Sequence, residues 1–103
     1  MEFWTAIAIV SRARRDALPS GFHRAYTPVI GLASNREEFI ASLRTKLRSE
    51  GLRLLRVDEV QSVCSDKDLR RMSSDLQSRA ASLTSNDPVD FGNLHLYKDE
   101  EDN

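Results

Sequence analysis

The stretch SNREEFIASLRTKLRSEGLRLLRVD, residues 34–58, specifies a helix followed by a strand and marks each boundary. Ser34 and Asn35 are both good N-cap residues, and each has a glutamate three positions later, which is the capping-box spacing. Gly51 suits the left-handed position that ends many helices. The segment therefore predicts a helix over residues 36–50.

A single apolar stripe runs along this predicted helix. Phe39, Leu43 and Leu47 recur at intervals of four residues, and Ile40 lies beside them. Such a stripe is stable only when it packs against another element, so we expect the helix to cover a sheet.

The residues after Gly51 predict a strand over 53–58. We expect Leu55 and Val57 to share one face of that strand and Leu54 to occupy the other, because successive side chains alternate. The acidic residues that follow Val57 are expected to end it.

Two further strands are predicted before the helix. Residues 2–10 are apolar on both alternating faces apart from Thr5, which is typical of a strand covered on both sides. Residues 11–21 predict a loop and residues 22–33 a second strand, antiparallel to the first because a loop joins them. Pro28 has no N–H to donate, so we expect an edge, a bulge or a break there.

A second helix and a last strand are predicted downstream. Ser65 is a candidate N-cap, and an apolar stripe follows it with steps of three and four residues. Residues 84–90 predict a polar loop, and residues 91–97 a strand. The members of the stripe are Leu69, Met72, Leu76, Ala80 and Leu83.

The resulting order, β-β-α-β-α-β, predicts an α+β fold. We expect a two-layer sandwich in which two helices cover one face of a mixed or antiparallel four-stranded sheet. Residues 1–97 are predicted to form a single domain, because halves of this 103-residue chain would be too small for a core. Residues 98–103 are expected to be an acidic, disordered tail.

The composition, 40% hydrophobic and 30% charged, is that of an ordinary globular protein. The longest apolar run, residues 6–10, is far too short to span a bilayer, and we expect no membrane association. One cysteine cannot form an internal disulfide, and only His23 and His95 could join it in a zinc site. We therefore expect no metal or other cofactor and a reducing, cytoplasmic location.

Catalytic and phosphate-binding motifs are missing from the sequence. Neither His23 nor His95 lies in a nucleophile-elbow pattern, and the four glycines are too scattered for a phosphate-binding loop. Arg12, Arg14 and Arg15 make a short basic loop, but a pI of about 6.1 is low for a nucleic-acid-binding domain. The sequence therefore predicts neither an enzyme nor a nucleic-acid partner.

Charge is divided unevenly along the chain. Residues 1–34 carry four arginines and two acids, a net charge of +2, whereas residues 66–103 carry five cations and nine acids, a net charge of −4. Carboxylates can steer a protein onto a cationic partner, and buried aromatic side chains can anchor it there. The alternative is that these carboxylates only cap a helix and solvate the tail. The candidate partner-binding residues are Asp66, Asp68, Asp75, His95, Tyr97, Asp99, Glu100 and Glu101.

In this general make-up the chain resembles the small immunity proteins that bacteria encode beside secreted antibacterial toxins. The resemblance covers the whole chain and rests on one cytosolic α+β domain with an acidic C-terminal half, without a signature motif. It implies a non-enzymatic protein that neutralises a cognate toxin, such as a nuclease, by occluding its active site or a functional surface. Residues 21–47 also resemble HicB-type antitoxins in element order, although the usual Pro-x-x-Gly-Cys-like element is missing.

The alternative hypothesis is a small regulatory or ligand-binding α+β domain that forms a homodimer through its sheet. A sheet face without helices, displaying Trp4 and Tyr26, would supply that interface. The two hypotheses differ in the expected partner, which is either a heterologous toxin or a second copy of the chain.

Overall fold

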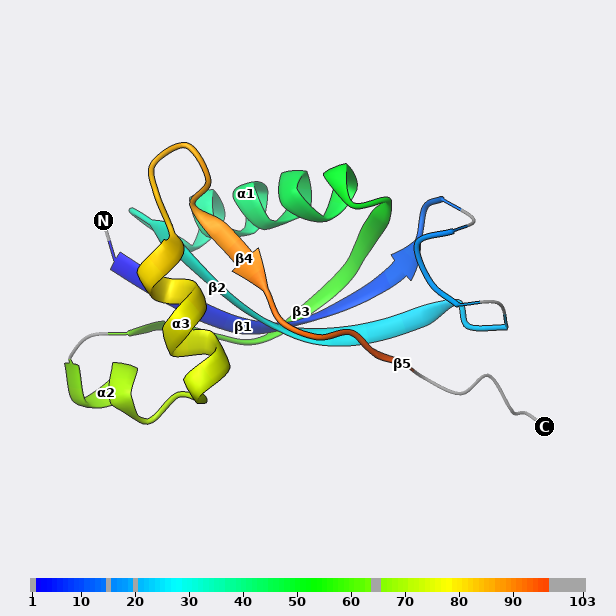
Figure 1. The fold of residues 1–103 in the computed structure, drawn as a ribbon. Coiled ribbons are helices and arrows are strands. Elements are labelled where there is room, and N and C mark those ends of the chain that lie inside the picture. Colours follow the sequence, from blue (N-terminus) through cyan, green and yellow to red (C-terminus); the bar gives the residue numbers. More distant parts are fainter. Residues whose placement is uncertain (1, 15, 20, 64–65, 97–103) are drawn as a thin grey trace.

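The computed structural model describes residues 2–14, 16–19, 21–63 and 66–96. Figure 1 shows α1 on one side of the sheet and the shorter helices on the other. The elements are β1 (Glu2–Arg12), β2 (Arg24–Ala33), α1 (Arg36–Ser49), β3 (Leu52–Val63), α2 (Asp66–Arg70), α3 (Ser74–Ser82), β4 (Val89–Phe91) and β5 (His95–Leu96).

The sheet is antiparallel throughout, in the order β3-β1-β2-β4, and β5 also pairs with β2. This arrangement confirms the predicted α+β class and the antiparallel pairing of the first two strands. β1 lies between β3 and β2, inside the sheet, as expected for a strand whose residues are apolar on both alternating faces.

The two faces of the sheet are covered by different helices, which corrects the prediction that both helices share one face. α1 packs on the face that carries Ala8 and Val29, and its apolar stripe is fully buried there. α3 lies on the opposite face, where Leu76 approaches Ile7 and Pro28. Because β1 is apolar on both sides, one helix layer could not remove all of its apolar surface from water.

α1 begins where the sequence predicts and ends one residue earlier than predicted, at Ser49. Asn35 is its N-cap, and the side-chain Oδ1 of Asn35 accepts a hydrogen bond from the backbone N–H of Glu38 at 2.8 Å. Phe39 is fully buried, and its ring centroid lies 6.2 Å from that of Trp4. Trp4 therefore lies under α1, so its expected place on an uncovered sheet face is wrong.

Gly51 follows α1 with a φ of +78°, in the left-handed region that favours glycine, and an added Cβ would overlap Arg14 Nε. We expect Gly51→Ala to lower the free energy of unfolding by about 1–2 kcal/mol in urea denaturation. Gly21→Ala is a matched control, because Gly21 has a φ of +90° and open space around it. Equal losses at the two positions would contradict a steric contribution from Arg14.

Pro28 lies within β2, which remains a continuous strand. The interruption falls in the neighbouring segment that pairs with β2, between β4 and β5. The carbonyl oxygen of Pro28 accepts a hydrogen bond from the N–H of Gly92 at 2.8 Å, so the missing N–H of Pro28 faces the same neighbouring segment. The register there shifts by one residue, from Val29 opposite Phe91 to Tyr26 opposite His95. The last strand, predicted over residues 91–97, is therefore two short strands separated by a bulge, and the first of them begins at Val89, within the predicted loop.

β3 is longer than predicted and continues to Val63, past the acidic residues expected to end it. Its register with β1 shifts twice, which leaves Leu55 and the segment at Glu59 (φ +54°) as bulges. Leu54 and Val57 both pack against the core, whereas Leu55 is 49% exposed. The prediction that Leu55 shares a face with Val57 is therefore wrong, because a bulge lies between them.

The predicted second helix is divided into α2 and α3. Ser73 caps α3, and its hydroxyl accepts a hydrogen bond from the N–H of Leu76 at 3.2 Å. The side-chain amide of Gln77 donates to the carbonyl oxygen of Met72 at 2.8 Å. The apolar spacing continues across the break, so periodicity alone did not reveal it. The expected N-cap Ser65 lies outside the described residues.

Candidate protein-binding face

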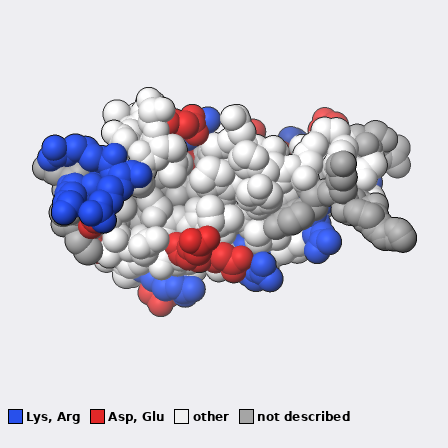
Figure 2. Space-filling view, turned by 90° about the horizontal axis from the view of Figure 1, so that it is seen from below, with Lys and Arg blue, Asp and Glu red and all other residues white. Residues whose placement is uncertain are grey.

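Among the described residues, α3 packs mainly on β2 and β4 and α2 mainly on β3, which leaves part of this sheet face without a helix over it. Four side chains lie opposite one another on four strands in the uncovered part: Arg56, Ile9, Tyr26 and His95. Directly opposed residues of antiparallel strands point to the same face. We call these four residues the open row. Figure 2 looks onto this side of the molecule and shows uncharged surface with acidic and basic groups along its margins.

Two aromatic rings stack at one end of the open row. The ring centroids of Tyr26 and His95 are 4.8 Å apart, and the ring planes differ by 17°. Tyr26 is 37% exposed and His95 is also exposed, whereas Ile9, opposite Tyr26 in the same row, is only 8% exposed. Strand backbones and mutual stacking hold both rings in place, so a partner would bury them at a low cost in side-chain entropy.

On the side of the open row that is nearer to α3, the next pair of opposed residues on this face forms the wall of a small pocket. Ile7 and Pro28 line this pocket together with Met72 and Leu76, and its volume is about 140 Å³. That volume is below the roughly 300–1,000 Å³ of typical small-molecule sites. The pocket is therefore better suited to a single apolar side chain of a docking protein than to a free ligand.

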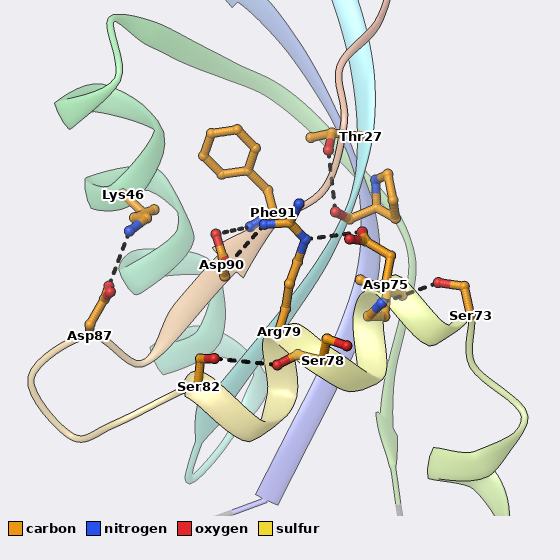
Figure 3. A network of polar contacts seen from close by, with 12 residues as sticks. Thr27, Lys46, Ser73, Asp75, Ser78, Arg79, Ser82, Asp87, Asp90 and Phe91 are labelled. Atoms are coloured by element: carbon orange, nitrogen blue, oxygen red, sulfur yellow. Dashed lines mark hydrogen bonds and ion pairs between the residues drawn. The ribbon is translucent and has the colours of Figure 1, made fainter.

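Ion pairs fix the margins of this face. On β3, Arg56 Nη2 lies 3.0 Å from Asp58 Oδ2, in an exposed pair that contributes little to stability. Beside α3, Arg79 lies between two carboxylates, with Nε 3.0 Å from Asp75 and Nη1 3.0 Å from Asp90. Figure 3 shows this bridge, which joins α3 to β4.

The two carboxylates act on the titration of Arg79. The hydrogen bond that Arg79 donates to Asp75, followed by the one that it donates to Asp90, raises the pKa of Arg79 above its ordinary value. Because the pKa of Arg79 is higher in the folded state than in the unfolded state, its contribution to stability is complete at pH values below the unfolded-state pKa. That contribution is lost only as the pH rises through the still higher folded-state pKa. Arg79 therefore keeps its charge throughout the neutral range.

A larger hollow lies elsewhere, between α1 and the loop that precedes β4, with a volume of about 430 Å³. Lys46 Nζ and Asp87 Oδ1, both in its lining, lie 3.2 Å apart (Figure 3). Because these two charged groups pair with each other, the hollow offers a ligand little uncompensated charge.

The predicted site residues are separated in the structure. His95 lies in the open row, whereas Asp75 is paired with Arg79. Asp68 is exposed on α2, which also carries the cations Lys67 and Arg70, and Figure 2 shows a basic cluster at this end. α2 is therefore not a uniformly acidic surface. Asp66 begins α2 but its side chain is not described, and Tyr97, Asp99, Glu100 and Glu101 lie outside the described residues.

Sequence reasoning missed Ile9 and Arg56 as members of a site, although Tyr26 was expected on an uncovered sheet face and is exposed there. One signal was present: residues 2–10 are apolar on both alternating faces, so the side away from α1 also carries apolar residues. The position of Arg56 depends on the two bulges of β3, for which the sequence shows no clear marker.

Within residues 2–14, 16–19, 21–63 and 66–96, no three His, Cys, Asp or Glu side chains gather in a way that would hold a metal ion. None of the helices in this described part of the chain has the length and apolar character needed to cross a membrane. No known protein family, curated protein or solved structure matches the chain.

Proposed function

We propose that this chain is a non-enzymatic binding protein that uses the open row to dock on a protein partner. The observation that carries the proposal is the stacked, exposed pair Tyr26–His95 beside an apolar pocket. Tyrosine is enriched among the residues that dominate binding energy, and such residues work best beside a pocket from which water is excluded. The ion pair of Arg56 and Asp58 would lie at the polar rim of the interface.

The partner that we propose is a cognate toxin, neutralised in the cytoplasm by occlusion of its active site or a functional surface. This part of the proposal rests on the resemblance in general make-up to bacterial immunity proteins. Docking would depend on burial of Tyr26 and His95, with exposed carboxylates such as Asp68 contributing to the rate of association.

A homodimer is the second candidate, and the protected edges of the sheet favour a face-to-face form of it. β3 is the long edge strand, but it carries bulges at Leu55 and Glu59 and charges at Arg56 and Asp58. Bulges and charges on an edge strand disfavour pairing with another strand. A second copy would therefore use the open row, as a toxin would.

Tyr26→Ala is expected to weaken binding of the partner by at least about 30-fold, which corresponds to the 2 kcal/mol of an interface hot spot. The partner is first captured on the immobilised protein, then purified for isothermal titration and for an assay of its own activity. Leu55→Ala is the matched control, because Leu55 is an exposed apolar residue at a bulge outside the open row. We expect this control to bind normally.

Each outcome decides between the candidates. A toxin that is inhibited by the wild type and by Leu55→Ala, but not by Tyr26→Ala, supports neutralisation through the open row. A mass that doubles with concentration in wild type but not in Tyr26→Ala supports the homodimer. Equal partner affinity for wild type and Tyr26→Ala would show that the open row is not the docking surface.

A further inference from the structure

A smaller pocket lies on another part of the molecule, between the C-terminal half of α1 and the start of β3. Three arginines line it: Arg44 and Arg48 from α1, and Arg53 from β3. Its volume is about 210 Å³, and its remaining lining is uncharged: Ala13, Leu52 and Leu54. No aspartate or glutamate contributes to the lining.

These three arginines have no carboxylate partner within the part of the chain that the structure describes. A guanidinium group cannot lose its proton under physiological conditions, so all three charges persist. Like charges gathered at one pocket repel one another, and a bound anion would relieve that repulsion. Walls of low polarity, here including the nearly buried Leu52, strengthen the attraction for such an anion.

Arg14, from the loop between β1 and β2, adds a further guanidinium beside this pocket. The carbonyl oxygen of Gly51 accepts hydrogen bonds from the N–H groups of Ala13 at 2.7 Å and Arg14 at 3.0 Å, which fixes the loop over the start of β3. The side chain of Arg14 lies against Gly51. Asp16 is only a distant partner, 3.9 Å from Arg14 Nε. Arg15 of the same basic loop lies outside the described residues.

Helix stabilisation explains only part of this arrangement. Cations in the last turns of a helix interact favourably with its negative end, which accounts for Arg48 and to a lesser extent for Arg44. It does not account for Arg53, which comes from a strand and also lines the pocket. A third arginine at this position adds repulsion without benefit to the helix.

We propose that this pocket is a binding site for a phosphate group. Guanidinium groups present paired N–H donors that match phosphate oxygens, and arginines from two elements could hold the phosphate from two directions. The three arginines surround a small pocket on a chain of net charge −1, which favours a small phosphorylated compound over a nucleic acid. This proposal is independent of the open row.

Isothermal titration with inorganic phosphate and with adenosine 5′-monophosphate tests it. We expect saturable binding with a Kd of about 1 mM or tighter, weakened about tenfold in Arg53→Gln and in Arg48→Gln. Arg36→Gln is the matched control, because Arg36 is an exposed arginine at the opposite end of α1, and it should bind as the wild type does. Tyr26→Ala should also bind phosphate normally, which separates this site from the proposed docking face.

Saturable binding of either probe, lost selectively in the two pocket variants, supports the proposal. A tighter Kd for the nucleotide than for inorganic phosphate would assign the phosphate to an organic carrier, and equal values would assign it to the free ion. Binding that does not saturate, or that falls equally in Arg36→Gln and Arg53→Gln, would overturn the proposal, since it would reflect general attraction to surface arginines.

Discussion

Replacing Phe39 with alanine is expected to lower the free energy of unfolding by about 3–5 kcal/mol. Phe39 is fully buried, stacks on Trp4 and lies against Gly31, so its removal leaves a cavity between α1 and the sheet. A domain of this size is commonly stable by about 5–15 kcal/mol, so the loss is a large share of the total. Urea unfolding followed by circular dichroism measures it.

Leu55→Ala is the control for that measurement. Leu55 is 49% exposed and lies at a bulge of the edge strand, so its truncation should change the unfolding free energy by less than about 1 kcal/mol. Similar losses in the two variants would contradict the placement of Phe39 at the centre of the core.

Gly31→Ala is expected to lower the free energy of unfolding by about 1–3 kcal/mol. A Cβ at Gly31 would lie 2.8 Å from ring atoms of Phe39 and 2.9 Å from Val89. The φ of Gly31 is not positive, so the cost arises from crowding alone. Glycine at this point of β2 is what allows α1 to approach the sheet closely.

A double mutant separates crowding from other causes. Phe39→Leu removes part of the ring that an added Cβ would meet, so we expect Gly31→Ala combined with Phe39→Leu to be more stable than the sum of the single losses predicts. A coupling of about 1 kcal/mol in the cycle of urea-unfolding measurements is typical for residues in contact. If the two losses in unfolding free energy simply add, there is no steric crowding between residue 31 and the ring of Phe39.

The sequence provided only part of each candidate site. His95 and Tyr26 were each singled out, but their stacking depends on a register in which β5 pairs with β2 after a bulge opposite Pro28. The arginine pocket combines Arg48 with Arg53, which are close in sequence, while Arg14, distant in sequence, lies against Gly51. Such long-range placement is set by strand pairing, and the composition of a segment does not encode it.

The sequence by itself determined α1, because the cap at Asn35, the stripe that begins with Phe39 and the glycine that ends the helix act over only a few residues. It also determined the central place of β1, through the apolar character of both its faces. Only the tertiary structure decided that the helices lie on opposite faces and that Leu55 points away from the core. The physical reason is that one bulge reverses which side chains face inward, and packing against the rest of the sheet selects where the bulge forms.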